Sequence, residues 1–335
     1  MPSRALVPAE PHYPGLSPRA YEHPADRAMT AALQRIPALD RVLRLLASVR
    51  YERAVRQRLL GNSVRIGADQ LPGLHADHLA ALRTLDLEPA PELYVGQSPW
   101  AQAVTIGIDR PVIVLHSTLL RTLGPAQTRA VLAHEAAHVQ SGHLLYRTSL
   151  AVLLNISLSR LPALGEATRR ALVLLLLEWA RTSELSCDRA AVLAVRDPMV
   201  VCGALMQLAA GDVPGLSVDA FVRQAESYRD DAGPVSRSLR FLEEIDATHP
   251  WSVRRVNEVV AWVRGGEYDR IAAGDYLRRG SEPPLGEDIG GAVDHYRDRL
   301  AGALEDAGLG LRQLSTRLRD WLRRAGADPE TSEEV

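Results

Sequence analysis

Cysteine is scarce in this sequence and lysine is absent. The 335 residues include only Cys187 and Cys202, with no Cys-x-x-Cys pair, which excludes a secreted disulfide scaffold and a cysteine-rich zinc module. Both cysteines lie in apolar, helix-like sequence, so we expect them to be buried thiols. All 39 basic residues are arginines, which indicates a GC-rich and therefore bacterial coding sequence.

The sequence also lacks a strong charge of either sign. Its formal net charge is -2 and its isoelectric point is about 6.6, so no nucleic acid partner and no general affinity for an anionic membrane are expected. Hydrophobic residues make up 46% of the chain, which is enough to bury a core. The function must therefore come from a local site and not from a charged surface.

Long hydrophobic runs are missing. The two most apolar stretches are bounded by charges: Thr148–Ser159 lies between Arg147 and Arg160, and Ala171–Leu177 lies between Arg170 and Glu178. Both are shorter than the roughly 20 residues that a membrane-spanning helix needs. We expect buried helices in a soluble, cytoplasmic protein, and peripheral membrane contact is the alternative that remains.

Three regions are expected along the chain. Residues 1–25 are rich in proline and have no continuous apolar segment, so they do not form a signal peptide, and we expect a flexible leader. Residues 26–265 should form the folded domain. Residues 266–335 should form a linker that contains proline and glycine, followed by amphipathic C-terminal helices.

The pattern of apolar residues predicts a mainly helical α+β fold with one small sheet. Strands are expected at 92–96, 102–108 and 111–117, where β-branched residues alternate or cluster between turn signals. Periodicities of three and four residues predict helices at 26–60, 76–85, 125–145, 146–161, 166–197, 198–210, 218–228, 235–245, 252–263 and 294–325. The sheet lies next to the third of these helices, and no alternation of strands and helices indicates a parallel βαβ array.

The segment AVLAHEAAHVQSGH, residues 130–143, holds three of the ten histidines. It follows a glycine-proline helix start, so His134 and His138 should project from one helix face, one turn apart, and share one ion. Imidazole suits Zn²⁺, and Glu135 is placed to reach a zinc-bound water. Chance predicts only about 0.02 copies of His-Glu-x-x-His in a chain of this composition.

A catalytic zinc takes three protein ligands and keeps a fourth position open. Glu184 and Asp188 lie one helical turn apart in RTSELSCDRAA. Glu184 completes a His-His-Glu set, and Asp188 lies within reach of a ligand histidine as a hydrogen-bond acceptor; a solvated acidic face is the alternative for this pair. His143 follows His138 by five positions and is rotated away from the ligand face, so it stays unassigned.

Three motifs follow one another along the chain. They are HEAAH with GH after it, E-x-x-x-D from Glu184 to Asp188, and THP at Thr248–Pro250 with two arginines downstream. Together with the lead-in LYVGQSPWAQAVTIG, they resemble the HtpX-like, CAAX-endopeptidase-related zinc metallopeptidases of the gluzincin group. The resemblance covers about Pro91 to Ala261 and implies a zincin-like fold.

The resemblance also implies a set of roles. One Zn²⁺ per chain would be bound by His134, His138 and Glu184, and Glu135 would act as general base and then general acid. Asp188 would orient a ligand histidine from behind the site.

Further roles rest on the resemblance alone. His249 would lie near the metal as an oxyanion donor, with a helix-capping role as the alternative. Arg254 and Arg255 compete for the role of supporting arginine. An extended peptide would pair with main-chain groups along the strand of Gln102, Ala103, Val104, Thr105 and Ile106. Gln102 replaces the family's usual asparagine there, so we expect changed specificity and not lost binding.

These features predict a zinc-dependent endopeptidase that hydrolyses peptide or unfolded protein substrates, with protein quality control as its setting. The alternative is a catalytically inactive protein that zinc stabilises, or an interaction protein at the membrane periphery. Glu135 argues against the first of these, because a structural zinc site closes its fourth position and has no use for a general base. The sequence carries no signal for an oligomeric state.

Overall fold

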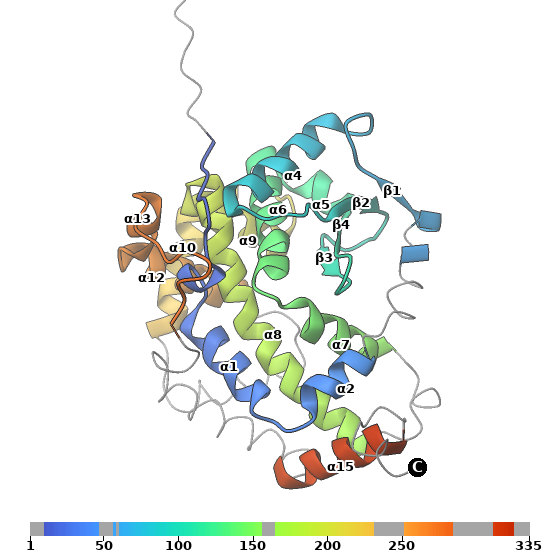
Figure 1. Cartoon of the computed structure of the whole chain (residues 1–335). Helices are drawn as coiled ribbons and strands as arrows, with labels where there is room; N and C mark the ends of the chain where they lie inside the picture. Colours follow the sequence, from blue (N-terminus) through green and yellow to red (C-terminus); the bar gives the residue numbers. More distant parts are fainter. Residues whose placement is uncertain are drawn as a thin grey trace, which may run out of the picture.

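The chain forms a mainly helical α+β fold around one small sheet (Figure 1). The computed structural model describes residues 10–46, 56–57, 60–155, 165–230, 251–283 and 311–324. Its elements, in chain order, are η1 (Pro18–Ala20), α1 (Pro24–Gln34), α2 (Leu39–Leu46), β1 (Ser63–Arg65), α4 (Pro72–Leu85), β2 (Glu92–Gly96), β3 (Ala103–Ile106), β4 (Val112–His116), α5 (Ser117–Thr122), α6 (Pro125–Gln140), α7 (Leu144–Asn155), α8 (Glu166–Val195), α9 (Pro198–Ala210), α10 (Val218–Asp230), α12 (Ser252–Arg264), α13 (Glu267–Ala272) and α15 (Leu311–Arg324).

The sheet has the strand order β1-β2-β4-β3, so β3 is an edge strand. β4 pairs in parallel with β2 and antiparallel with β3. Its side chains alternate between the two faces: Ile113 and Leu115 pack with α4 and α6, whereas Val112 and Val114 pack with Tyr94 on the other face. The sequence did not predict β1, because three residues carry too short a pattern.

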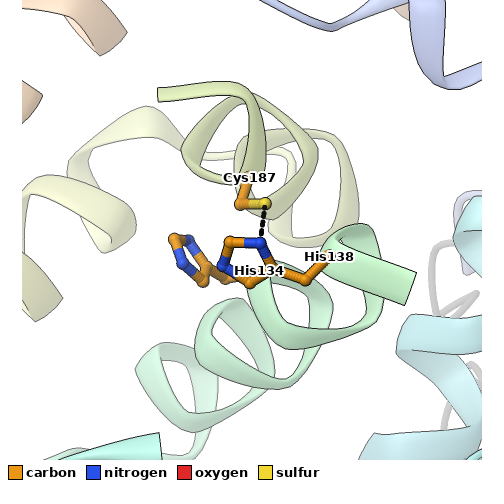
Figure 2. A group of neighbouring side chains, drawn as sticks. All are labelled: His134, His138 and Cys187. Carbon is orange, nitrogen blue, oxygen red and sulfur yellow. Dashed lines mark hydrogen bonds between the residues drawn. The ribbon is translucent and has the colours of Figure 1, made fainter. Parts of the chain in front are cut away.

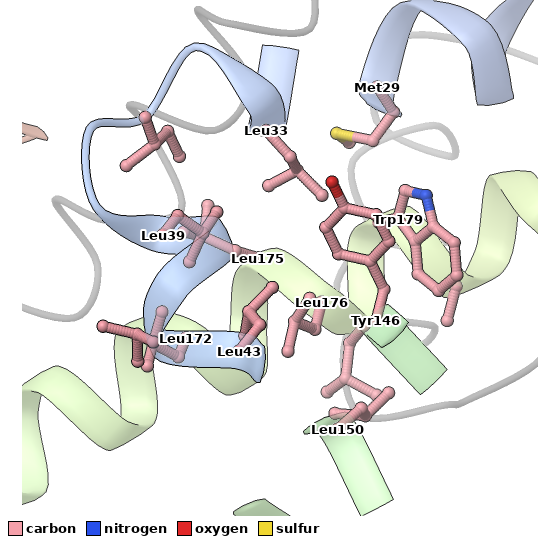
Figure 3. Close-up of a cluster of buried hydrophobic side chains, with 14 of the residues drawn as sticks. Met29, Leu33, Leu39, Leu43, Tyr146, Leu150, Leu172, Leu175, Leu176 and Trp179 are labelled. Atoms are coloured by element: carbon pink, nitrogen blue, oxygen red, sulfur yellow. The ribbon is translucent and has the colours of Figure 1, made fainter. Parts of the chain in front are cut away.

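α8 is the long central helix, and it runs through two hydrophobic cores (Figure 1). Its first half, between Ala171 and Ala180, packs with α1, α2, α7 and α15; Figure 3 shows the part of this core formed with α1, α2 and α7. Its second half, between Cys187 and Leu193, packs with α4, α6, α9 and α12. Each fully buried leucine contributes about 1.5–3 kcal/mol, so the two cores fix the middle of α8, where Glu184 lies.

Local sequence sets both ends of α6, the helix that carries HEAAH. Pro125 occupies its first position, where the missing N–H costs nothing. At the other end Gly142 adopts a left-handed φ of 69°, and the N–H of His143 donates to the carbonyl of His138 at 3.0 Å. This glycine stop turns the chain back, so that His143 lies behind the helix and does not continue it.

The helix predicted from Asp26 to about Leu60 is interrupted. α1 ends at Gln34 and α2 begins at Leu39, and Ala38 between them has a φ of 67°. Pro37 explains the break, because it has no N–H to donate and disfavours a helical residue before it. Residues 47–55 of that prediction lie outside the described residues.

The expectation of a flexible leader is wrong for the part after residue 12. Tyr13 and Leu16 are buried in the core that contains α4 and α12. The N–H of Tyr13 donates to the carbonyl of Thr84 at 3.2 Å, and the N–H of Ser17 donates to the carbonyl of Leu277 at 3.0 Å. The predicted linker after residue 265 is therefore also partly ordered structure: it contains α13 and a segment that pairs with the N-terminal residues.

Other predictions can be compared only in part. The helix predicted at 198–210 is confirmed at both ends, and that at 252–263 is confirmed within one residue. The helix predicted at 235–245, the start of that predicted at 294–325, and residues 1–9 lie outside the described residues. Within the described ranges, no helix combines the length and apolar character that crossing a membrane requires.

Candidate metal centre and active site

His134 and His138 project from one face of α6 toward α8, as their spacing predicts (Figure 2). Both are buried, and their ring centroids lie 5.1 Å apart. Glu184 on α8 faces both rings: its Oε2 lies 3.3 Å from His134 Nε2, and its Oε1 lies 3.3 Å from His138 Nε2. One carboxylate thus contacts the same nitrogen of each imidazole.

This donor set fits a tetrahedral metal ion. Bonds of about 2.0–2.1 Å from zinc to nitrogen or oxygen place neighbouring ligand atoms roughly 3.3–3.4 Å apart. Glu184 Oε2 lies 3.3 Å from His134 Nε2 and Glu184 Oε1 lies 3.3 Å from His138 Nε2, so each imidazole has one carboxylate oxygen at this spacing. Two imidazoles and one carboxylate also match the ligand count of a catalytic site, which leaves a fourth position for water or substrate.

Asp188 holds the other nitrogen of His134. Its Oδ1 lies 3.1 Å from His134 Nδ1, while Arg255 donates from Nε to Oδ2 at 2.8 Å and from Nη2 to Oδ1 at 2.6 Å. Burial lowers the pKa of His134, but the hydrogen bonds to Asp188 and Glu184 outweigh it and raise the pKa to about 9. This arrangement orients the His134 ring with Nε2 toward Glu184.

Cys187 offers a second grouping of ligand atoms. His134, His138 and Cys187 each place one ligand atom within 4.8 Å of the others (Figure 2). The sulfur lies 3.3 Å from His138 Nδ1, whereas Glu184 lies at Nε2 of the same ring. Burial raises the pKa of the Cys187 thiol well above its ordinary value, and metals bind the thiolate and not the thiol. These properties favour the grouping that includes Glu184.

Arg147 places a positive charge against the same acceptors. Its Nη1 donates to Glu184 Oε1 at 2.7 Å and to His138 Nε2 at 2.8 Å. His138 therefore presents an unprotonated Nε2, and burial together with Arg147 lowers its pKa well below the ordinary value. The lone pairs of His138 Nε2 and Glu184 Oε1, which a metal would use, are thus directed at the guanidinium of Arg147.

Glu135 is held from the sheet. Thr105, on β3, donates from its hydroxyl to Glu135 Oε2 at 2.7 Å, and the backbone carbonyl of Glu135 lies 3.1 Å from the same hydroxyl. Thr105 is fully buried, so this contact between the edge strand and α6 is shielded from bulk water. The Glu135 carboxylate lies beside His134. Unlike the Glu184 carboxylate, it does not face both imidazoles.

A cavity of about 230 Å³ opens at these residues. Its polar lining includes His134, Glu135 and Glu184. Its apolar lining comes from α5, α6 and α9 and includes Leu119, Val131, Val201, Leu205 and Leu208. The site therefore joins ionisable groups to a space that suits an apolar side chain.

The predicted substrate strand lies along this cavity. Gln102 and Ala103 line it, whereas Val104 and Ile106 pack on the far face of the sheet with Tyr94. Among the described residues β3 pairs only with β4, so one edge of its main chain has no strand partner. Such an edge is the surface to which an extended peptide can add as a further strand.

Some site residues were placed by the structure and not by sequence spacing. Arg255, and not Arg254, contacts Asp188. Arg147 comes from α7 and Asp26 comes from α1, and no local pattern pointed to either. His249 lies outside the described residues, so its role as an oxyanion donor stays a prediction.

A helix with paired histidines and an adjacent glutamate, joined by a carboxylate from the packed helix α8, defines a metal-dependent peptidase. The chain belongs to peptidase family M48, whose model matches residues 72–263, and it hydrolyses peptide bonds as a metallopeptidase. A relative from Arabidopsis thaliana, the plastoglobule-localized metallopeptidase 48, chloroplastic, is 37% identical over 257 residues, which is 75% of this chain and 74% of the relative. No solved structure matches the chain.

Proposed function

We propose that the metal is zinc, one ion per chain, bound by His134, His138 and Glu184, and that the protein is an endopeptidase acting on unfolded polypeptides. The observation that carries this proposal is the pair of 3.3 Å distances from the Glu184 carboxylate to the two Nε2 atoms. Zinc accepts both imidazole and carboxylate in a tetrahedral arrangement. The absence of a thiolate among these ligands is typical of a catalytic site.

Glu135 is the proton carrier in this proposal. A bound zinc ion supplies Lewis acidity at the substrate carbonyl and lowers the pKa of water to about 7. The Glu135 carboxylate takes the proton from the attacking water and then gives it to the leaving amine. Thr105 holds Glu135 Oε2, which fixes the carboxylate in one orientation for both transfers.

The substrate lies extended along β3, and its main-chain groups pair with the strand edge at Gln102 to Ile106. A side chain next to the scissile bond enters the cavity against its apolar lining, at Val131 and Leu208. Only an unfolded segment can present its main chain to a strand edge in this way, which supports a function in protein quality control.

We place the protein in the cytoplasm, with membrane contact no closer than peripheral. The Arabidopsis relative is a plastoglobule-localized protein, and peripheral contact of this chain with a lipid surface accords with that location. Peptide hydrolysis itself does not depend on this placement.

The experiment that tests the proposal separates the two glutamates. Glu135→Gln should retain about one zinc per chain but lose nearly all hydrolysis of casein, because the proton acceptor is gone. Glu184→Gln should lose zinc and activity together, because an amide oxygen binds zinc far more weakly than a carboxylate. Zinc content is measured after dialysis against a weak chelator.

Two further variants complete this test. Glu166→Gln changes an exposed glutamate at the start of α8 and should alter neither zinc content nor activity. Cys187→Ala should retain zinc. If Cys187→Ala loses zinc while Glu184→Gln keeps it, the ligand set is the one with the thiol and the proposed set is wrong.

A further inference from the structure

A chain of buried polar side chains runs from His138 to the N-terminal helix. His138 Nδ1 lies 3.0 Å from His143 Nδ1, and His143 Nε2 lies 3.1 Å from Asp26 Oδ2. The Ser186 hydroxyl donates to the same Asp26 oxygen at 2.6 Å. We call His138, His143 and Asp26 the histidine relay. All three members are at most 3% exposed, so water does not compete for these contacts.

The two ends of the relay determine where each proton lies. Arg147 can only donate, and it donates to His138 Nε2, so the proton of this neutral ring is on Nδ1. That N–H therefore donates to His143 Nδ1, which must be unprotonated. The proton of His143 is then on Nε2, and it donates to Asp26, whose carboxylate accepts.

Asp26 accepts from more than one side chain at the far end of the relay. The backbone N–H of His23 donates to the Ser186 oxygen at 2.9 Å, which leaves the Ser186 hydroxyl proton for Asp26. Asp26 is thus an acceptor for His143 and Ser186 through Oδ2, and the Thr30 hydroxyl donates to its Oδ1 at 3.4 Å.

We propose that Asp26 and His143 are positioning residues for metal binding: they hold His138 with Nδ1 protonated and the Nε2 lone pair directed at the metal. His134 is oriented by one carboxylate directly, through Asp188, whereas His138 is oriented by a carboxylate through a second imidazole. Carboxylates behind ligand histidines typically change metal affinity by about 10- to 100-fold. The inference rests on the proposed zinc site and adds the N-terminal helix α1 to it.

Packing alone does not account for the relay. His143 stacks edge-on against Trp179, with ring centroids 5.3 Å apart, and a phenylalanine would satisfy that contact equally. The Cys187 sulfur, 3.3 Å from His138 Nδ1, is the competing acceptor for the same proton. The experiment must therefore separate His143 from Cys187.

The first measurement reads the protons directly in the full-length, zinc-loaded protein. Long-range proton–nitrogen NMR correlations distinguish the two tautomers of a neutral histidine. We expect a protonated Nδ1 on His138, and on His143 an unprotonated Nδ1 with a protonated Nε2. A His143 ring protonated on Nδ1, or on both nitrogens, overturns the proposal without any variant being needed.

The second measurement is the affinity for Zn²⁺ alone, by competition with a chromogenic chelator. His143→Phe and Asp26→Asn should each weaken binding about 10- to 100-fold. The double variant should bind no more weakly than His143→Phe, because Asp26 acts on His138 only through His143. His78→Phe removes another buried histidine, which contacts the Pro91 carbonyl far from the metal site, and should keep wild-type affinity.

The outcomes distinguish this inference from the function on which it rests. Wild-type protein that does not bind zinc contradicts the proposed function. Zinc-binding wild type with an unchanged His143→Phe variant overturns the relay alone, as does strong weakening by Cys187→Ala in place of His143→Phe. Additive losses in the double variant also overturn it, because two independent structural roles give that result.

Discussion

Buried charges are concentrated on a few side chains between α1, α6, α8 and α12, and most of them face an opposite charge. Asp188 faces Arg255, and Glu184 faces Arg147. Glu22 is only partly buried, and it differs because a second carboxylate, that of Asp26, lies near it. Burial and this neighbour raise the pKa of Glu22 to about 7. The folded protein therefore carries a carboxyl group whose ionisation works against its stability.

Glu22→Gln is expected to stabilise the metal-free protein above pH 7 and to leave its stability unchanged near pH 4. The ordinary pKa of this carboxyl is 4.5, so between pH 4.5 and 7 the folded state binds the proton more tightly than the unfolded state. The free energy of unfolding then falls as the pH rises through this window, by roughly 3 kcal/mol in total. Glutamine cannot ionise and avoids this loss.

Urea unfolding of both proteins at pH 4 and pH 8 measures the difference. Glu166→Gln serves as the matched control, because Glu166 is exposed and its pKa is lowered by Arg169, so this variant should gain nothing at pH 8. Equal stability of wild type and Glu22→Gln at pH 8 would contradict the prediction.

Local spacing was sufficient to predict which side chains of the proposed metal site share one helix face. His134 and His138, and likewise Glu184 and Asp188, lie one turn apart, so their common direction follows from helix geometry. Arg254 and Arg255 were not separable, because neighbours on a helix differ by about 100° in direction and the partner helix was unknown. Asp26 was not predictable, since it reaches His143 across 117 positions of the sequence.

α9 supplies much of the apolar lining of the cavity. It contributes Val201, Leu205 and Leu208, while α6 contributes Val131 together with the proposed ligands His134 and His138. The two helices pack against each other, so the distance from the proposed ligands to the apolar lining is fixed. In the proposed function, α9 therefore contributes to the choice of substrate side chain without contributing a ligand.

Leu208→Arg is expected to lower kcat/KM for peptides with leucine next to the scissile bond by about 10- to 100-fold. A guanidinium in the apolar lining replaces a favourable contact with a charge that must stay hydrated. Zinc content should not change, because Leu208 contacts no proposed ligand. Peptides with glutamate at the same position should lose much less, and the ratio of the two kcat/KM values is the measurement.

Leu216→Arg provides the matched control for this prediction. Leu216 is 43% exposed, lies after the end of α9 and does not line the cavity, so its replacement should leave the ratio unchanged. An unchanged ratio in Leu208→Arg would mean that the cavity does not hold the substrate side chain.

Elements with a strong period were predicted from the sequence, and those set by single backbone positions were not. Proline and apolar spacing were sufficient for the bounds of α9 and, to within one residue, α12, because Pro198 marks the start of α9 and apolar residues recur at helical spacing along α12. The break at Ala38 depends on a left-handed residue after Pro37, which apolar periodicity does not record. β1 depends on pairing with β2, a contact that three residues cannot indicate.

At the scale of the whole molecule, the segment before α1 lies against the segment after α13. Residues near Ser17 pair with the segment after α13, through Ser17 to Leu277 and the bridge of Leu16 with Arg278. Asp86, after α4, contacts both of these segments: it accepts from the N–H of Gly15 at 2.8 Å and forms an ion pair with Arg279. The N-terminal segment is thus part of the folded domain.

Leu16→Ala is expected to destabilise the protein by about 2–5 kcal/mol, the range for truncating a fully buried leucine. Leu16 is 0% exposed and lies in the core with α12 and α13. Leu216→Ala, at a 43% exposed position, should change stability by less than about 0.5 kcal/mol. Thermal and urea unfolding measure both, and a Leu16→Ala variant as stable as wild type would restore the picture of a flexible leader.

Composition misled the prediction for this segment for a physical reason. Prolines and the absence of an apolar run are shared by flexible leaders and by extended segments that pack into a groove. Only the tertiary partners, Thr84 and Leu277, distinguish them, and both lie far away in the sequence.

The arrangement of the metal site also has a consequence for the order in which the protein is made. Asp26 comes from α1, the paired histidines from α6, Glu184 from α8 and Arg255 from α12, so more than 200 residues separate the first contributor from the last. At about 5–20 residues per second, a ribosome needs roughly 10–50 s to synthesise that interval. A nascent chain therefore carries HEAAH well before Arg255 is available to hold Asp188, so the complete set of contacts around the site forms only after α12 has been made.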